Sequence, residues 1–340
     1  MTHGSHDPDP IRPRCLRNAI RAVVWLLLAV VAALVPGTRV GASSAPVSRA
    51  APYLYLGWGS PPDPVAVLSA TGVRDFTLAF VLAGHGCTPK WDGTRPLLGG
   101  GDAASIAAIR NAGGDVSASF GGWSGRKLGS TCRTPAALAG AYEQVIDAYG
   151  LRAIDVDIEH TEFTNRTTRH RVVTALHLVQ AADPGVEISV TFGTGPSGPD
   201  ATGRSLLADA ASVGFVPYAW TIMPFDFGLQ VSDMGATTVA AGDGLHADLM
   251  STFSMDSATA YAHMGISTMN GLTDEPDETV GVADYQRILT YARTNHLARL
   301  TFWSVNRDRP CPSGAAAGDS CSGIAQSPGQ FTALTAGYTG

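Results

Sequence analysis

The chain has 340 residues and a formal net charge of −6. This length suits one barrel domain of about 250 residues with additions, rather than two large domains. An acidic chain whose only lysines are Lys90 and Lys127 argues against binding nucleic acid or an anionic membrane through a basic face, and it suits a neutral substrate.

The first 42 residues predict a secretory signal peptide. Four arginines precede an apolar run at 22–35, and small residues follow up to Ala42 and Ala45, the two expected cleavage points. Cleavage removes five arginines and two aspartates, which moves the formal charge from −6 to −9. A run of 14 residues is shorter than the roughly 20 that a membrane span needs. We therefore expect a secreted, extracellular protein with no stable membrane partner, and an uncleaved signal anchor is the alternative.

Strands and helices alternate from residue 53 to the end of the chain, after a short Ala/Ser-rich linker at 43–52. The strands are predicted at 53–58, 75–81, 115–120, 151–160, 186–192, 218–223, 266–269 and 300–303. The helices are predicted at 63–70, 103–111, 135–149, 165–182, 204–213, 245–264 and 284–295. Eight strands alternating with helices over about 250 residues are the pattern of a (β/α)8 TIM barrel, which we expect to fill residues 53–340.

The strand at 151–160 carries the most informative pattern. Asp155, Asp157 and Glu159 fall on one face and apolar residues on the other, because strand side chains alternate with period two. Three carboxyl groups inside a barrel cannot all ionise, so one of them must keep its proton. Barrels place their chemistry at the C-terminal ends of the strands, so Glu159, the last acid, is the expected proton donor. The alternative is an edge strand whose acids are solvated.

Cysteine usage indicates disulfides. Four of the five cysteines lie beyond the signal peptide, and an even number in an exported chain is typical of disulfide pairing. Three connectivities are possible, and proximity in the sequence favours Cys87–Cys132 and Cys311–Cys321. No CxxC or HExxH spacing occurs, so zinc is not expected, and no other metal or cofactor is predicted.

Five motifs together resemble glycoside hydrolase family 18, and within it the secreted bacterial chitinases, over nearly all of residues 53–335. The acidic strand resembles the family's DxxDxDxE pattern, with Arg152 in place of the first Asp. Ser119, Gly121 and Gly122 match its SxGG motif. The other three motifs lie at 223–226, 269–274 and 302–308.

The resemblance implies retaining hydrolysis of β-1,4-linked N-acetylglucosamine by a substrate-assisted route. It makes Glu159 the acid and base, and it makes Asp157 the group that orients the substrate's acetamido group. Asp155 would share a proton with Asp157. Asp226 would hydrogen-bond the distorted sugar, and Trp303 would form the apolar floor beneath it. The expected substrate is chitin or a chitooligosaccharide, and the expected enzyme is a monomer.

Each further candidate also has a plainer interpretation. Trp303 is an aromatic residue that suits a core, Asp226 suits a turn, and Gly121 and Gly122 suit an ordinary strand-to-loop turn. Met223 belongs to the site only through its motif. The remaining candidates are two tryptophans that suit either sugar platforms or structural positions: Trp58 and Trp123.

One departure from the family pattern concerns a tyrosine whose hydroxyl binds the acetamido group. Phe225 and Phe227 occupy both positions where it is expected, and loss of one such donor typically costs about 10²–10³ in rate. Tyr218 or another residue would then have to supply the hydroxyl. Two alternative functions therefore stay open: a chitin-binding, lectin-like barrel with little turnover, and an endo-β-N-acetylglucosaminidase acting on N-glycans.

Overall fold

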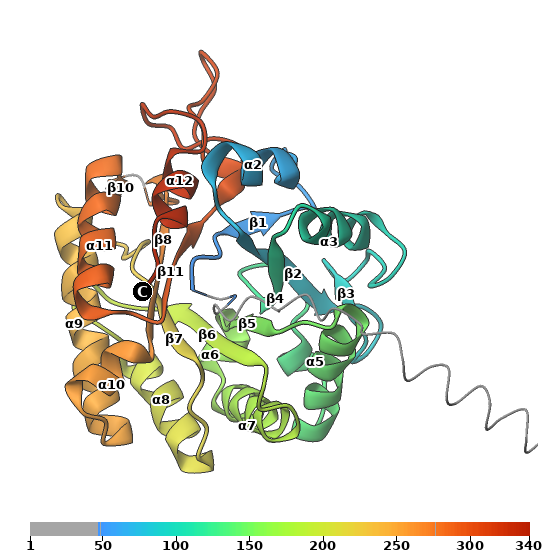
Figure 1. Ribbon diagram of the computed structural model, residues 1–340. Coiled ribbons are helices and arrows are strands. Elements are labelled where there is room, and N and C mark those ends of the chain that lie inside the picture. Colours follow the sequence, from blue (N-terminus) through green and yellow to red (C-terminus); the bar gives the residue numbers. More distant parts are fainter. Residues whose placement is uncertain (1–46, 48, 276) are drawn as a thin grey trace, which may run out of the picture. The chain divides into compact units, whose positions relative to one another are not determined.

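The structure, a computed structural model, describes residues 47, 49–275 and 277–340, and the predicted signal peptide lies outside this part of the chain. In the described part, eight parallel strands form a nearly closed barrel, and the helices lie on its outside (Figure 1). The predicted TIM barrel is confirmed.

The barrel strands follow one another in chain order. They are β1 (Tyr53–Tyr55), β2 (Asp75–Ala83), β4 (Asp115–Gly121), β5 (Ala153–Asp157), β6 (Glu187–Gly193), β7 (Ala219–Met223), β8 (Met264–Met269) and β11 (Arg299–Trp303). Short antiparallel additions are β3 (Pro89–Trp91), which pairs with β2, and the pair β9 (Gly271–Leu272) and β10 (Thr279–Val280).

Eight of the described helices lie on the outer connections between successive barrel strands. They are α2 (Pro64–Thr71), α3 (Gly101–Asn111), α5 (Pro135–Tyr149), α7 (Arg166–Ala182), α8 (Ala201–Val213), α9 (Met234–Phe253), α10 (Ser257–Ala262) and α11 (Val282–Asn295). The other helical segments are α4 (Leu128–Thr131), α6 (His160–Thr164), the 3₁₀ turn η1 (Val305–Arg307) and α12 (Gln330–Ala336).

The prediction of one helix at 245–264 is wrong at both ends. The structure has two helices here, and the first begins eleven residues earlier, behind the Asp233 side chain, which accepts a hydrogen bond from the Ala236 N–H at 2.8 Å. It ends where Ser254 takes a left-handed conformation with φ 55°. Asp256 then caps α10 by accepting the Thr259 N–H at 2.8 Å.

Residues 49–52, within the predicted linker, directly precede β1 and bond to β11 on one side and β2 on the other. The Arg49 carbonyl accepts the N–H of Leu300 at 2.9 Å, and the Pro52 carbonyl accepts the N–H of Thr77 at 3.0 Å. Through these two hydrogen bonds the segment that leads into β1 joins β2 to the last strand, β11.

Helix α5 has the bounds that the sequence predicted, and local chemistry explains them. The Thr134 hydroxyl accepts the Ala137 N–H at 3.1 Å and begins the helix. Gly150 ends it in the left-handed conformation, with φ 55°, which costs glycine little. The chain can therefore turn directly into β5.

Strand β5 is central, since it pairs with β4 on one side and β6 on the other. The edge-strand alternative is therefore wrong. Ile154 and Val156 face outward into the apolar layer under the helices, and Asp155 and Asp157 are only 1% and 4% exposed. The period-two pattern thus places the carboxyl groups inside the barrel.

Small hydroxyl side chains accompany these acids in the barrel interior, together with the buried cation Arg299. The buried hydroxyl residues on the barrel strands include Thr77, Ser117, Ser119, Ser189, Thr191, Thr221, Ser267 and Thr301. A polar interior of this kind can hold charges that an aliphatic one cannot.

Both predicted disulfides, Cys87–Cys132 and Cys311–Cys321, are confirmed. Among the described helices, none combines the length and the apolar character that crossing a bilayer requires.

Candidate active site

A cavity of about 350 Å³ lies at the C-terminal ends of the barrel strands. Its lining includes the last residues of β1, β5, β7, β8 and β11, together with the loops that follow them. The carboxyl groups that line it are Asp92, Asp157, Glu159, Asp226, Asp274 and Asp319.

Glu159 lies two residues beyond the end of β5, directly before α6. Burial raises the pKa of its carboxyl group to about 7, the charge of Lys127 opposes that rise, and the charge of Asp226 adds to it. A carboxylic acid with a pKa near neutrality is a suitable proton donor to a leaving group.

Asp157, at the end of β5, has an oxygen atom without a partner. Its Oδ1 is buried and makes no hydrogen bond to any described residue, although the side chain lines the cavity. Burial raises the pKa of Asp157 well above its usual value, and the charges of Glu159 and Asp155 raise it further. A buried oxygen of this kind is an acceptor held ready for a ligand.

Asp155 lies below the cavity floor and does not line it. Its Oδ2 accepts the hydroxyls of Tyr53 at 2.8 Å and Ser119 at 2.6 Å. Its Oδ1 accepts the hydroxyl of Thr191 at 2.7 Å and the Arg299 guanidinium at 2.6 Å. Four donors therefore surround a carboxyl group that was expected to share a proton with Asp157.

Ser119, Gly121 and Gly122 do not line the cavity, but they shape it from behind. Gly121 is at φ +102°, where an added Cβ would lie 2.1 Å from the Asp157 carbonyl oxygen. At Gly122, φ is +79° and the Cβ would meet the Phe80 ring at 2.6 Å. These positions therefore require glycine so that the β4 loop can lie close to β5 and Phe80.

Lys127 holds this glycine loop and was not predicted as a site residue from the sequence. Its buried Nζ donates to the backbone carbonyls of Gly121, Gly122 and Ser124. Burial lowers the pKa of Lys127, and the nearby Glu162 and Glu159 oppose that shift. A lone lysine in a loop without periodicity offers little sequence signal.

Aromatic rings form one side of the cavity. Trp303, the last residue of β11, stacks on Phe80 with 5.6 Å between ring centroids and an interplanar angle of 12°. Tyr53 and Tyr55 lie near it, at 5.9 and 6.1 Å. A flat apolar surface beside carboxyl groups suits a sugar ring.

Trp58 and Trp123 lie at the exposed margin of the same cavity, with 45% and 66% of their surfaces accessible. Trp58 packs edge-on against Tyr55, with 4.9 Å between centroids, and Trp123 lies 3.8 Å from the ring of His160. Exposed aromatic rings of this kind can extend a binding surface beyond the cavity.

Met223, Phe225 and Asp226 line the cavity from the end of β7. Asp226 Oδ1 accepts the backbone N–H groups of Asp274 at 3.0 Å and Glu275 at 3.3 Å, so it also holds the loop after β9. Burial raises the pKa of Asp226.

Tyr218 does not supply the hydroxyl that the two phenylalanines lack. Its hydroxyl donates to the Ala298 carbonyl at 3.0 Å, and it does not line the cavity. Ser267 does line it: its side chain is 1% exposed, and its Oγ has no hydrogen-bond partner among the described residues. Ser267 and Met269 are two residues apart on β8, so both side chains point toward the inside of the barrel.

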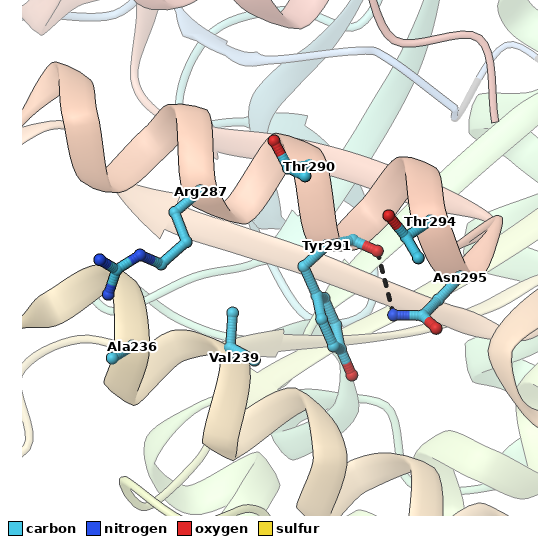
Figure 2. A pocket seen from close by; sticks show the side chains of 7 residues that line it. All are labelled: Ala236, Val239, Arg287, Thr290, Tyr291, Thr294 and Asn295. Atoms are coloured by element: carbon cyan, nitrogen blue, oxygen red, sulfur yellow. Dashed lines mark hydrogen bonds between the residues drawn. The ribbon is translucent and has the colours of Figure 1, made fainter.

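A second hollow lies between α9 and α11 on the outside of the barrel (Figure 2). None of the seven residues that line it carries a carboxyl group. Arg287 pairs with Asp233 at 2.8 Å, and Asn295 donates to the Tyr291 carbonyl at 3.1 Å. This hollow therefore lacks the acid and base groups of the barrel cavity. Among the described residues, no group of three or more His, Cys, Asp or Glu side chains is arranged to hold a metal ion.

Comparison with known proteins gives relatives that are named chitinases. The chain is 28% identical over 276 residues to a probable bifunctional chitinase/lysozyme of Escherichia coli, which covers 76% of this chain and 31% of that protein. It is also 28% identical over 275 residues to endochitinase 11 of Metarhizium anisopliae, covering 76% of this chain and 52% of that protein. The chain thus spans about a third to a half of these relatives. No family model matches it.

Solved structures share the barrel. The catalytic domain of the hyperthermophilic chitinase from Pyrococcus furiosus superposes with a TM-score of 0.77 at 27% identity, covering 87% of this chain and 98% of that one. A GH18 chitinase from Pseudoalteromonas aurantia shares the fold alone, with a TM-score of 0.50 at 14% identity, covering 75% of this chain and 93% of that one.

Fold and comparisons together give a TIM barrel that is similar to those of family 18 chitinases. The resemblance to the family 18 chitinases, first seen in five short motifs, is thereby confirmed.

Proposed function

We propose that the chain hydrolyses β-1,4 linkages between N-acetylglucosamine units of chitin or chitooligosaccharides, with retention of configuration. The observation that carries this proposal is the pairing of Glu159 with Asp157 in one aromatic-lined cavity, where Asp157 keeps an unpartnered buried oxygen. The chitinase relatives support the same substrate class.

In the first step Glu159 donates its proton to the glycosidic oxygen. The substrate's own acetamido oxygen attacks the anomeric carbon as the glycosidic bond breaks, so the leaving chain departs as an alcohol. The product of this step is a cyclic oxazolinium ion. Asp157 orients the acetamido group through the N–H and offsets the positive charge that develops on it.

In the second step a water molecule attacks the anomeric carbon from the side that the leaving group has vacated. Glu159, now a carboxylate, takes a proton from this water, and the oxazolinium ring reopens to the acetamido group. Two displacements at the same carbon return it to its original configuration. A pKa of Glu159 at about 7 suits both its acid and its base role.

The acetamido group needs a second polar contact, and Ser267 provides it in this proposal. Its buried, unpartnered Oγ lies in the lining of the cavity that also contains Asp157. Trp303 forms the apolar floor beneath the sugar, Met223 and Asp226 contact it from β7, and the exposed Trp58 and Trp123 extend the cleft.

The protein is proposed to act outside the cell. Two disulfides and the signal-peptide pattern of residues 1–42 support this localisation. A monomer with no partner other than the saccharide is the accompanying proposal.

Glu159→Gln tests the proposed function directly. Turnover of N,N′-diacetylchitobiosides that carry a fluorogenic leaving group should fall by about 10²–10⁴-fold, because Gln cannot donate the proton. Glu162→Gln is the matched control: Glu162 is buried three residues away but does not line the cavity, so turnover should stay within about tenfold of the parent. Equal turnover by the parent and Glu159→Gln would show that Glu159 is not the acid.

Phe225 in the cavity favours one other candidate, a chitin-binding barrel with little turnover, since it brings no hydroxyl to the site. The same assay separates the two functions, because a protein that only binds releases no fluorophore from the chitobioside while still retaining chitin. Product analysis on an N-glycosylated protein tests the endo-β-N-acetylglucosaminidase alternative.

A further inference from the structure

Arg299 is the one strongly basic group that contacts the acids of β5 from inside the barrel, in the part of the chain that the structure describes. It lies at the start of β11, its side chain is fully buried, and its Nη1 donates to Asp155 Oδ1 at 2.6 Å. The acidic strand does not contain this charge, and Arg299 comes 144 residues after Asp155 in the sequence.

Hydroxyl groups from several strands hold the guanidinium in place. Nη1 also donates to Thr191 of β6 at 3.1 Å, and Nη2 donates to Thr77 of β2 at 3.0 Å. The guanidinium carbon lies 5.5 Å from the centroid of the Tyr53 ring. Nη1 also lies 3.4 Å from the Thr221 hydroxyl of β7, so contacts from four other strands leave the guanidinium little freedom to leave Asp155.

Asp155 in turn has no vacant oxygen. Tyr53 and Ser119 donate to Oδ2, while Thr191 and Arg299 donate to Oδ1. A carboxyl group that accepts from four donors, one of them a guanidinium, is stabilised as the anion. A proton on either oxygen would face a donor and would weaken the ion pair.

We propose that Arg299 is a positioning residue that keeps Asp155 as the permanently ionised acid, so that the exchangeable proton of the acidic strand is confined to Asp157 and Glu159. This inference rests on the proposed function. It departs from the expectation that Asp155 and Asp157 share a proton. Asp157 lies between Asp155 and Glu159, and its Oδ1 has no hydrogen-bond partner among the described residues. In this proposal it therefore exchanges a proton with Glu159 and with groups in the cavity.

The groups around Arg299 and Asp155 are mostly neutral. Tyr53, Ser119, Thr191 and Thr77 are neutral hydroxyl groups, and burial raises the pKa of Tyr53 well above its usual value, so it stays a donor. The charged neighbours of Asp157 are Glu159, Asp155, Lys127 and Arg299, and Tyr218 is within electrostatic reach of Arg299.

The first test is the pH dependence of kcat/KM for Arg299→Met and Arg299→Lys with a chitobioside substrate. A fixed positive charge opposes protonation of nearby acids, so its removal should move the acid limb of the profile upward by about 1–3 pH units. Arg299→Lys keeps the charge and should keep the limb within about half a unit of the parent. A purely structural role would lower the rate at every pH without moving the limb, and that result would overturn the proposal.

Arg169→Met is the matched control. Arg169 is also buried and pairs with an acid, Asp209, at 2.9 Å, but this pair joins α7 and α8 outside the barrel. This variant should be less stable than the parent and should keep the parent's acid limb. If the acid limb moved equally in Arg169→Met and Arg299→Met, the shift would not be specific to Arg299 and the proposal would be overturned.

The second test does not depend on activity. Urea unfolding of the parent, Arg299→Met, Asp155→Asn and the double variant forms a double-mutant cycle at pH 4.5 and pH 7.5. If Asp155 is an anion paired with Arg299, Arg299→Met should lose more stability at pH 7.5 than at pH 4.5, and the double variant should recover part of it. If Arg299→Met does not fold, recovery of folding by the double variant carries the same conclusion. Equal losses at both pH values, with no recovery, would refute the ion pair.

The two proposals fail differently. A parent that releases no product from chitobiosides overturns the proposed function, and the unfolding cycle still decides the state of Asp155. An active parent whose acid limb does not move in Arg299→Met overturns only the role of Arg299.

Discussion

Lys127 shows how one backbone-bound cation can influence the protonation of Glu159, the proposed catalytic acid. Its ammonium group satisfies its donors on the carbonyls of Gly121, Gly122 and Ser124, while its charge acts on Glu159. It therefore both fixes the β4 loop and opposes the burial that raises the pKa of Glu159. A lysine in this position lets a buried acid titrate near neutrality instead of far above it.

Removing this charge gives the first prediction. In Lys127→Met the pKa of Glu159 should rise, so the alkaline limb of the kcat/KM profile should move above pH 7 by about 1 unit. Glu159 should stay protonated to higher pH, although loss of the loop contacts should lower the maximal rate. Lys90→Met, a lysine on β3, is the matched control and should keep the parent's limb. A shift to lower pH would contradict the assignment.

Ser267 gives the second prediction at this scale. Ser267→Ala removes the unpartnered hydroxyl from the cavity, and the rate should fall by about 10²–10³ if this group binds the acetamido oxygen as charge develops. Stability should hardly change, because no protein hydrogen bond is lost among the described residues. Ser189→Ala, which removes another buried unpartnered hydroxyl that does not line the cavity, is the control. Equal kcat in parent and Ser267→Ala would remove Ser267 from the site.

At the scale of elements, the contact between the β4 loop and β5 decides where Asp157 lies. Gly121 pairs with Asp157 in the sheet. Its φ is +102°, and a Cβ added there would lie 2.1 Å from the Asp157 carbonyl oxygen. A side chain there must push the two strands apart.

Gly121→Ala should therefore destabilise the protein by more than about 1 kcal/mol and reduce activity, because Ala is strained at this φ and clashes with backbone. Gly140→Ala is the control: Gly140 lies within α5 with nothing near its Cβ position, so Ala should stabilise the helix by about 0.5–1 kcal/mol. Urea unfolding measures both changes. A Gly121→Ala variant as stable as the parent would contradict the close approach.

Sequence patterns were sufficient for some elements and insufficient for others. The period-two alternation of β5 and the helical segment at 135–149 predicted both elements, because local rules decide them. Helix α9 was placed eleven residues late, since Gly235, Gly242 and Gly244 interrupt the helical pattern. Tertiary contacts explain those glycines: Asp284, Tyr291 and the Ser197 carbonyl, respectively, lie where their side chains would be.

The candidate site shows the same division. The acids at the end of β5 and Trp303 are visible in motifs, and the cavity brings Asp157, Glu159 and Trp303 together. Arg299 was missed although it shares the inward face of β11 with Trp303, four residues later, because its partner Asp155 is remote in sequence. Ser267 was not predicted, because what marks it is an Oγ without a hydrogen-bond partner among the described residues, and a sequence does not show hydrogen bonds.

For the whole molecule, buried carboxyl groups make stability depend on pH. Burial raises the pKa of Asp75, Glu159 and Glu162 to about 7 in each case. The folded protein therefore holds protons that the unfolded chain, with ordinary carboxyl pKa values near 4, has already released. The stability from these groups is fully present below about pH 4 and is lost as the pH rises to about 7.

The free energy of unfolding should accordingly be higher at pH 5 than at pH 8. Glu162→Gln should make that difference smaller, because Gln can still accept the Gly129 N–H, which now lies 2.6 Å from Glu162, without ionising. Glu143→Gln on α5 is the control and should keep the parent's difference. Urea unfolding at the two pH values provides the measurement, and a parent that is more stable at pH 8 would contradict the prediction.

The central claim for the molecule is that Glu159 acts with the substrate's own acetamido group, with no nucleophile from the protein. Proton NMR of the products released from a chitooligosaccharide in the first minutes measures the anomeric configuration of the new reducing end before it equilibrates. Two displacements at one carbon predict that the β-anomer appears first. Initial release of the α-anomer would show a single displacement by water and would contradict the account.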